Sequence, residues 1–469
     1  MGKGARILLA VAAAGVAVGI VARRPRPAPL PNILLVTVDT LRPDHLGAWG
    51  YPAGTSPVID AMAAEGASFL TTIVPRGQTW PTLATLLTGQ YPVTHGVRRN
   101  GLRLSEGAVT LGHVLGGAGY RCAAALANSG SAEWPGFAET VQDRDNDEAV
   151  RDAAIRFLRA HGETVRAARQ GGEPPAPFFL WVHLFAPHHP YQPAPELVDR
   201  FDPGYAGAMD GSLEQVKDIS ARRITPAAED VRHLIARYDG EVRTADGHVG
   251  RLLAALEDEG LAAGTIVAFT ADHGEELYER NRYLSHSASV YDSVLRAPWI
   301  LRWPGRIPAG RKIEGLAETG DIAPTLLELA GVRAPESFRG VSRAAAATGR
   351  GPGRIPDGPA FSELEDRVVS VRTAEVRYVS NPSDFDFPLD PEDPSARYPI
   401  DREELYDLVT DPAERDNRAP RFPNEASGLR DVVAKWQDEH GWSEASVRLR
   451  GREAPEDVRE ALDALGYVR

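Results

Sequence analysis

Three residues of types that bind divalent cations follow two apolar runs far apart in the chain. Asp39 closes "NILLVTVD", Asp272 closes "GTIVAFTAD", and His273 comes directly after Asp272. Both runs are rich in β-branched residues, which is typical of buried parallel strands. Because ligands bind beyond the carboxyl ends of such strands, we expect the three side chains to converge. The sequence therefore predicts one divalent cation, with Mn²⁺ or Zn²⁺ favoured by the imidazole and Ca²⁺ possible.

A hydroxyl stands at the start of a predicted helix, in "QTWPTLATLLTG", residues 78–89. Three leucines recur on one helical face: Leu83, Leu86 and Leu87. Pro81 suits the first turn and Gly89 suits the end, so Thr79 lies at or beside the N-cap. Thr79 has two interpretations. It is a plain helix cap, or its oxygen binds the cation, which lowers the hydroxyl pKa and makes a nucleophile toward phosphorus or sulfur.

Histidines and one asparagine are further candidates for the site. His188 and His189 lie in "FAPHHPY" just past the apolar run "PFFLWVHLF", and His286 lies in "YLSHSASVYD". Any of these imidazoles could bind an oxyanion or protonate a leaving group, and a structural role is equally open. Asn100, in "HGVRRN", offers an amide donor for a non-bridging oxygen. The acids Asp239, Glu241 and Asp246 lie on a long predicted helix and are interpreted as surface or interface charges.

Apolar strand patterns alternate with helical patterns over the first two thirds of the chain. This alternation predicts an α/β fold with a mainly parallel sheet sandwiched by helices. After about residue 340 comes the Gly/Pro linker "GRGPGRIPDGP", and "VVSVRTAEVRYVSN" then alternates like an antiparallel hairpin. We predict a catalytic domain over residues 31–345, a smaller antiparallel-sheet α+β subdomain over 352–435, and a helical tail over 436–469.

The composition limits the function classes and the compartment. A formal net charge of −13 argues against nucleic-acid binding over a wide surface, and the single cysteine, Cys122, excludes intrachain disulfides. Basic residues flank an apolar run over residues 7–22, and a Pro-rich spacer follows it. We interpret residues 1–30 as an export segment that is uncleaved or inefficiently cleaved, with a clean signal peptide as the alternative. The expected location is the cell envelope or periplasm, anchored to the membrane.

Several strings in a fixed order resemble the sulfatase family of the alkaline phosphatase superfamily, over roughly residues 31–435. The strings include "NILLVTVDTLRPDHLGAWGY", "PTLATLLTGQYPVTHGVRRN", "FFLWVHLFAPHHPY", "FTADHGEE" and "ETGDIAPTLLELAGV". The resemblance implies a sheet-between-helices core, a smaller C-terminal sheet domain and an ester-hydrolase site with one metal ion. In it, Asp39, Asp272 and His273 match metal ligands, while Thr40 stands where arylsulfatases place a second aspartate.

The resemblance departs from the family at the nucleophile. The sulfatase signature is Cys-x-Pro-x-Arg, whose cysteine is oxidised to formylglycine, and this chain reads Thr79-Trp80-Pro81-Thr82-Leu83 at that point. We therefore expect no formylglycine and a metal-bound Thr79 hydroxyl in its place. His188 matches a histidine that contacts the ester, and His286 falls near the leaving group. Asn100 matches a substrate-binding asparagine of phosphonate monoester hydrolases.

The predicted function is hydrolysis of sulfate or phosphate/phosphonate esters through a metal-activated Thr79. The expected partner is an anionic ester, either a small molecule or a glycan, and no nucleic acid. Two alternatives remain open. One is a membrane-associated transferase of phospho head groups. The other is a degenerate, non-catalytic member that binds anions, which Leu83 favours and the complete set of Asp39, Thr79, Asp272 and His273 opposes.

Overall fold

The computed structural model describes residues 30–127, 134–143, 145–171, 175–281, 283–390, 393–442, 452–453 and 456. The apolar run of the predicted export segment and the predicted helix at the end of the chain lie outside these residues. Within the described ranges, no helix combines the length and the apolar character needed to cross a bilayer.

An eight-stranded sheet in the order β11-β2-β10-β7-β1-β6-β4-β5 forms the centre of the molecule. Its strands are β1 (Asn32–Val38), β2 (Ala67–Ile73), β4 (Arg121–Leu126), β5 (Glu139–Gln142), β6 (Phe178–Leu184), β7 (Thr265–Ala271), β10 (Arg296–Arg302) and β11 (Arg311–Glu318). Strand β10 runs antiparallel to both of its neighbours, and the other pairs are parallel. The prediction of a mainly parallel sheet is confirmed.

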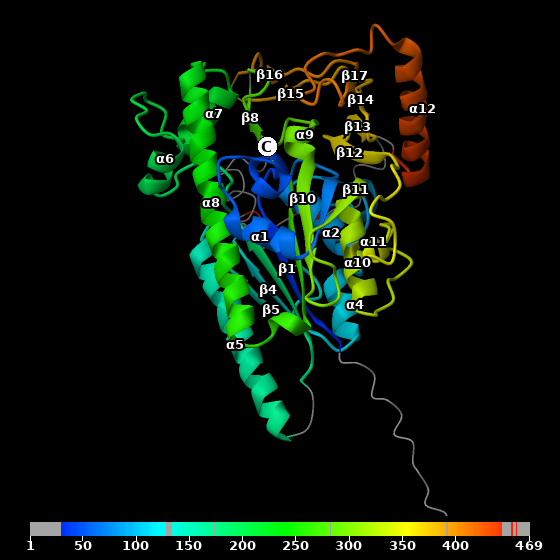
Figure 1. The fold of residues 1–469 in the computed structure, drawn as a ribbon. Helices are drawn as coiled ribbons and strands as arrows, with labels where there is room; N and C mark the ends of the chain where they lie inside the picture. The colour runs from blue at the N-terminus through cyan, green and yellow to red at the C-terminus, as the bar shows by residue number, and fades with distance from the viewer. Residues whose placement is uncertain are drawn as a thin grey trace, which may run out of the picture.

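Helices cover both faces of this sheet (Figure 1). The longer ones are α1 (Pro57–Glu65), α2 (Thr79–Thr88), α4 (Leu111–Gly117), α5 (Asp147–Gly171), α8 (Ala228–Asp258) and α10 (Ile322–Leu329). Strand β1 shows why its sequence is apolar throughout. Leu34 and Val36 belong to one buried cluster, which includes residues of α5 and α8, and Ile33 and Leu35 belong to another, which includes residues of α2 and α10. Both faces of the strand are therefore core.

Shorter elements surround the sheet. The helices are α3 (Pro92–His95), α6 (Pro195–Phe201), α7 (Leu213–Ser220), α9 (Asp292–Leu295) and α11 (Ala344–Ala347). Three two-stranded pairs also occur: β3 (Leu102–Arg103) with β18 (Arg452–Glu453), β8 (Glu276–Leu277) with β9 (Leu284–Ser285), and β15 (Phe387–Pro388) with β16 (Arg397–Tyr398).

A second, antiparallel sheet follows in the C-terminal part of the chain. Its order is β12 (Ala360–Leu364), β13 (Val368–Arg372), β14 (Val376–Ser380) and β17 (Glu403–Asp407), and α12 (Pro423–His440) packs against it. The antiparallel hairpin expected after the linker is present as β13 and β14. The helical tail was predicted to begin at residue 436. In the described residues, α12 continues through residue 436 without a break, and Arg452–Glu453 form a strand. The domain boundaries themselves stay a prediction.

The prediction of surface charges on the long helix is wrong for two of its acids. Asp239 and Asp246 on α8 are buried. Asp246 accepts hydrogen bonds from the backbone N–H groups of Val58 and Ile59 in the first turn of α1. A buried carboxylate that accepts the unpaired N–H groups at a helix start replaces their lost contact with water.

Candidate active site

Three of the predicted metal ligands, Asp39, Asp272 and His273, lie at the carboxyl edge of two neighbouring strands. Asp39 directly follows β1 and Asp272 directly follows β7, and both carboxylates are fully buried. The N–H of Asp39 donates to the carbonyl of Leu184 at 2.9 Å, and the N–H of Asp272 donates to that of Val38 at 3.3 Å. These bonds extend the parallel ladders by one residue. The strands therefore end in register, and the two carboxylates lie at the same edge of the sheet. The sheet edge therefore brings together the residues that the sequence predicted.

His273 lies at the centre of this group. Its Nε2 is 3.5 Å from Thr79 Oγ1, 3.5 Å from Asp272 Oδ2 and 3.7 Å from Asp39 Oδ1. Donor atoms that surround one cation tetrahedrally at about 2.1 Å stand about 3.4 Å apart. The three distances from His273 Nε2 are close to that spacing, so His273 can share one cation with each of the other three residues.

The backbone fixes the direction of these ligands. His273 Nδ1 donates to the carbonyl of Gly274 at 3.0 Å, which leaves Nε2 as the ring nitrogen that faces the carboxylates and can bind a cation. Asp272 Oδ1 accepts the N–H of His273 at 2.7 Å and that of Thr40 at 3.2 Å. Thr40 has φ of +51°. Thr40 contributes its backbone N–H to the site, as a donor to Asp272. The arylsulfatase pattern has an aspartate side chain at this position.

His183 is a member of the site that the sequence analysis missed. It lies in β6, next to β1, and its Nε2 is 3.9 Å from Asp39 Oδ2. One ligand atom each from Asp39, His183 and Asp272 lie within 4.8 Å of one another. His183 Nδ1 contacts Thr37 Oγ1 at 2.8 Å, and burial lowers the pKa of the imidazole to about 4, so it is neutral at pH 7. The available signal was one titratable residue near the end of an otherwise apolar strand.

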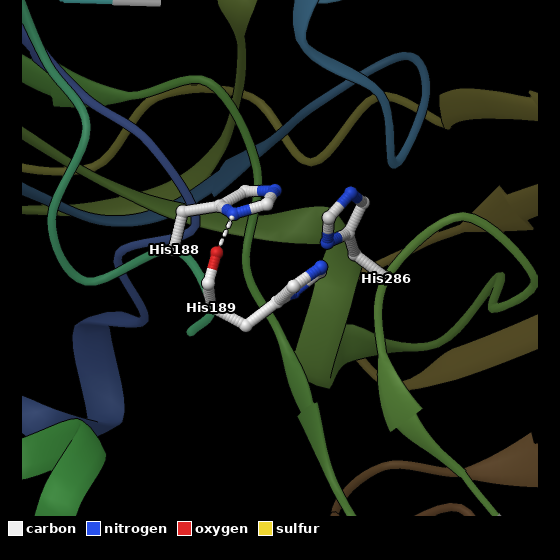
Figure 2. A group of neighbouring side chains, drawn as sticks. All are labelled: His188, His189 and His286. Carbon is white, nitrogen blue, oxygen red and sulfur yellow. Dashed lines mark hydrogen bonds between the residues drawn. The ribbon is translucent and has the colours of Figure 1, made fainter. Parts of the chain in front are cut away.

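His188, His189 and His286 form a second buried cluster, the histidine group (Figure 2). The rings of His188 and His189 lie 5.0 and 5.7 Å from that of His286, and one nitrogen of each lies within 4.8 Å of the others. His188 Nδ1 contacts the carbonyl of His189 at 2.6 Å. The ring of His286 is 4.5 Å from that of His273, so the histidine group adjoins the metal-ligand residues. His189 was considered with His188 in the sequence, but only His188 and His286 were assigned to the site.

Glu275 contacts two members of the histidine group, and the sequence analysis also missed it. Its Oε1 lies 3.0 Å from His286 Nδ1, and its Oε2 lies 3.7 Å from His189 Nδ1. Burial lowers the pKa of His286 to about 4, although Glu275 opposes the shift. His286 is therefore neutral at pH 7 in the unliganded protein. Proton donation from it requires the charge of a bound ester to raise that pKa.

Asn100 and Thr79 meet at the start of α2. Asn100 Oδ1 accepts the N–H of Trp80 at 2.9 Å, and within the described residues its Nδ2 makes no hydrogen bond. The N-cap of α2 is Gln78, and Thr79 is the first helical residue. The Thr79 hydroxyl contacts His273 and makes no capping bond that the described residues record. The simple cap interpretation of Thr79 is therefore not supported, and a substrate contact by Asn100 stays a prediction.

Glu276, the neighbour of Glu275, gives a stability prediction. It is buried, and burial raises its pKa to about 7 from a model-peptide value of 4.5, with Arg280 opposing the shift. Since the unfolded chain releases this proton near pH 4.5, the folded state loses stability as pH rises from 4.5 through 7. Glu276→Gln should remove that loss, so its unfolding free energy relative to wild type should grow by about 3 kcal/mol between pH 4.5 and pH 8.

Urea unfolding at several pH values measures this difference. Glu336→Gln, at an exposed glutamate, is the matched control and should show no such trend. A constant difference between Glu276→Gln and wild type across the range would contradict a neutral Glu276.

Comparisons with known proteins identify the family of the chain. The family model described as Sulfatase matches residues 31–332. A Delta 4,5-hexuronate-2-O-sulfatase of Bacteroides thetaiotaomicron is 28% identical over 422 residues, which cover 83% of this chain and 84% of that protein. Human arylsulfatase A is 27% identical over 490 residues, covering 89% of this chain and 87% of its own.

Solved structures share the fold at lower identity. A protein in complex with its substrate D-glucosamine-2-N,6-O-disulfate has a TM-score of 0.72 at 19% identity, covering 89% of this chain and 100% of its own. The phosphonate monoester hydrolase of Agrobacterium radiobacter has a TM-score of 0.67 at 22% identity, covering 87% and 96%. These likenesses confirm the α/β architecture.

The prediction that no formylglycine takes part is contradicted by these relatives. They are sulfatases, and enzymes of this type use a formylglycine nucleophile together with a metal ion. The prediction rested on one short motif. It used the residue types at positions 79 and 83 alone and gave no weight to the mechanism of the relatives. The structure explains one part of that motif, because Leu83 is buried in the apolar core beside Leu86 and Leu87. An apolar side chain at position 83 suits this packing.

The match to the family covers well over half of the chain, and the residues that match its metal ligands lie together at the carboxyl edge of the sheet. The chain belongs to the sulfatase family, and it is an ester hydrolase of that family.

Proposed function

We propose that the chain hydrolyses sulfate or phosphate/phosphonate esters, with Thr79 Oγ1 as the nucleophile and one divalent cation held by Asp39, Thr79, Asp272 and His273. The observation that carries the proposal is the distance of 3.5–3.7 Å from His273 Nε2 to one oxygen of each of the other three residues. Two nitrogen donors, if His183 joins the set, favour Mn²⁺ or Zn²⁺ further over Ca²⁺. The names of the sulfatase relatives support a sulfated glycan as substrate.

A bound cation supplies a lowered pKa at the coordinated hydroxyl and charge stabilisation for the ester. The chain's own residues do the rest. The Thr79 hydroxyl releases its proton to water, and Oγ1 attacks the sulfur or phosphorus atom. The bond to the leaving alcohol breaks, and the threonine ester that forms is then hydrolysed by water. Thr79 begins α2, so the positive end of the helix dipole lies beside the anion. His188 and His286, neutral when buried, hydrogen-bond the ester oxygens and donate a proton to the leaving group once the anion has raised their pKa.

A panel of esters tests the reaction type. Purified protein with added Mn²⁺ is incubated with an aryl sulfate, phosphate monoesters and diesters, a phosphonate monoester and a 2-O-sulfated disaccharide. We expect cation-dependent release of the alcohol from at least one ester. Product that forms only when an alcohol acceptor is added would favour the head-group transferase. No turnover, with no cation retained after gel filtration, would favour a degenerate anion-binding protein.

We also propose that residues 1–30 carry the protein out of the cytoplasm and keep it at the membrane, since basic residues flank their apolar run. Cells that express the full chain, and cells that express a form starting at Pro31, are fractionated and probed. The full chain should sediment with the membranes and resist extraction by salt, while the shortened form stays in the soluble cytoplasmic fraction. Identical soluble behaviour of both would contradict the export segment.

A further inference from the structure

One ring nitrogen of His183 faces the metal-ligand residues and takes part in no hydrogen bond. The side chain is fully buried in β6, directly opposite Thr37 of β1 in the parallel pair. Within the ranges that the structure describes, its Nε2 has no hydrogen-bond partner, and it lies 3.9 Å from Asp39 Oδ2. Since buried polar atoms are rarely left unpaired, a nitrogen in this position is suited to bind an ion.

Asp39 lies between two imidazoles. Its Oδ1 is 3.7 Å from His273 Nε2, and its Oδ2 is 3.9 Å from His183 Nε2. Two donor atoms that bind one cation at about 2.1 Å stand at most about 4.2 Å apart, and both distances fall below that limit. One atom each from Asp39, His183 and Asp272 also lie within 4.8 Å of one another. A small movement of these side chains therefore lets His183 share the cation assigned to Asp39 and Asp272.

Thr37 determines which ring nitrogen of His183 carries the proton. Trp181 Nε1 donates to Thr37 Oγ1 at 2.9 Å, and the Thr37 hydroxyl donates to the carbonyl of Val182 at 3.4 Å. With its single hydrogen used, Thr37 Oγ1 is an acceptor for His183 Nδ1, which lies 2.8 Å away. A proton on Nδ1 leaves the lone pair of Nε2 facing Asp39. The opposite tautomer would direct a buried N–H at Asp39 from beyond hydrogen-bond distance, which costs free energy.

We propose that His183 Nε2 is a fifth protein ligand of the cation, and that Thr37 is the positioning residue that fixes the tautomer this requires. The inference rests on the proposed function, because it adds one donor to the same cation site. It also gives the site a selectivity of its own. A second nitrogen donor favours Mn²⁺ or Zn²⁺ over Ca²⁺ more strongly than His273 alone would.

Electron–nuclear double resonance of the Mn²⁺-loaded full chain tests the ligand directly, because it measures the coupling of each bound imidazole nitrogen to the ion. We expect two nitrogen couplings in the wild type and one in His183→Gln. His161→Gln changes another buried histidine, which packs against Phe178, and should keep both couplings. A wild-type spectrum with a single nitrogen coupling would overturn the proposal without reference to any variant.

Cation affinity, titrated with Mn²⁺ alone and with Zn²⁺ alone, tests the role of Thr37. Thr37→Val removes the acceptor for Nδ1 and should weaken both cations about ten-fold or more, as other losses of a residue that supports a ligand do. Thr37→Ser keeps the hydroxyl and should bind within about two-fold of the wild type. Thr72→Val is the matched control and should bind like the wild type, because this buried threonine of β2 has no hydroxyl partner among the described residues. Equal affinities of Thr37→Val and Thr37→Ser would overturn the role of Thr37.

The outcomes separate this inference from the proposed function. Unchanged Zn²⁺ affinity and unchanged nitrogen couplings in His183→Gln would contradict the fifth ligand and leave the proposed function intact. Two nitrogen couplings that depend on His183, in a protein that turns over none of the esters, would contradict the proposed function alone. A wild-type chain that binds neither Mn²⁺ nor Zn²⁺ would contradict both.

Discussion

Thr79→Ala should lower turnover of the best ester by about a thousand-fold or more while the protein stays folded, because it removes the atom that forms the covalent bond. Thr79 is buried, its hydroxyl lies 3.5 Å from His273 Nε2, and the N-cap of α2 is the preceding Gln78. Since this hydroxyl caps nothing, its loss should not carry the 0.5–2 kcal/mol that a missing cap costs. Turnover and melting temperature are measured on the same samples.

Two further variants make the Thr79 result specific. Thr79→Ser keeps a hydroxyl and should retain measurable turnover. Thr82→Ala removes a second buried hydroxyl of α2, which donates to the carbonyl of Arg76 at 2.8 Å, and should cost stability with turnover largely intact. The mass of the peptide that contains residue 79 establishes its chemical form in the wild-type protein. Near wild-type turnover by Thr79→Ala would exclude Thr79 as the nucleophile.

Asp272→Ala should abolish stoichiometric cation binding and lower turnover by at least about a hundred-fold. Even loss of a residue that only supports a ligand costs 10–100-fold in metal affinity, so loss of a ligand should cost more. Asp272 Oδ2 faces His273 Nε2 at 3.5 Å, and Oδ1 accepts two backbone N–H groups. Elemental analysis after loading with Mn²⁺ and gel filtration should find about one ion per wild-type chain and almost none in the variant.

The matched variants separate metal loss from unfolding. Asp272→Asn keeps the shape and one acceptor for the backbone N–H groups, and should still lose the cation. Asp246→Asn changes another fully buried aspartate, which binds the start of α1, and should keep the cation. Unchanged metal content in both Asp272 variants would show that the cation site lies elsewhere.

The sequence was sufficient to predict that the residues at the strand ends of this site lie together. Asp39 and Asp272 each close a continuous apolar run, and such runs occur where both faces of a parallel strand are buried, as the two clusters around β1 confirm. The ends of parallel strands meet at one edge, so the convergence of Asp39, Asp272 and His273 follows from local pattern and topology. Gly89, with φ of +60°, likewise ends α2 where the sequence placed the stop.

Two further members of the site, and one buried acid outside it, depend on contacts that no local sequence pattern records. His183 joins because β6 is the strand that pairs with β1, and sequence order does not give strand order. Glu275 joins because its side chain reaches His286 across the base of the β8–β9 hairpin. Asp239 looked exposed on an amphipathic helix, yet it is buried against His45 and Tyr51 from distant parts of the chain. Long-range packing, which spacing does not encode, decides these three residues.

The coordination of Thr79 tests the account most directly. Crystals grown with Mn²⁺ and measured at the manganese absorption edge locate the ion from its anomalous signal. We predict one strong peak at the carboxyl edge of β1 and β7, with Thr79 Oγ1, Asp39, Asp272 and His273 Nε2 each at about 2.0–2.2 Å. A peak bound by other residues, or one from which Thr79 Oγ1 lies beyond about 3 Å, would contradict the claim that this hydroxyl is the metal-activated nucleophile.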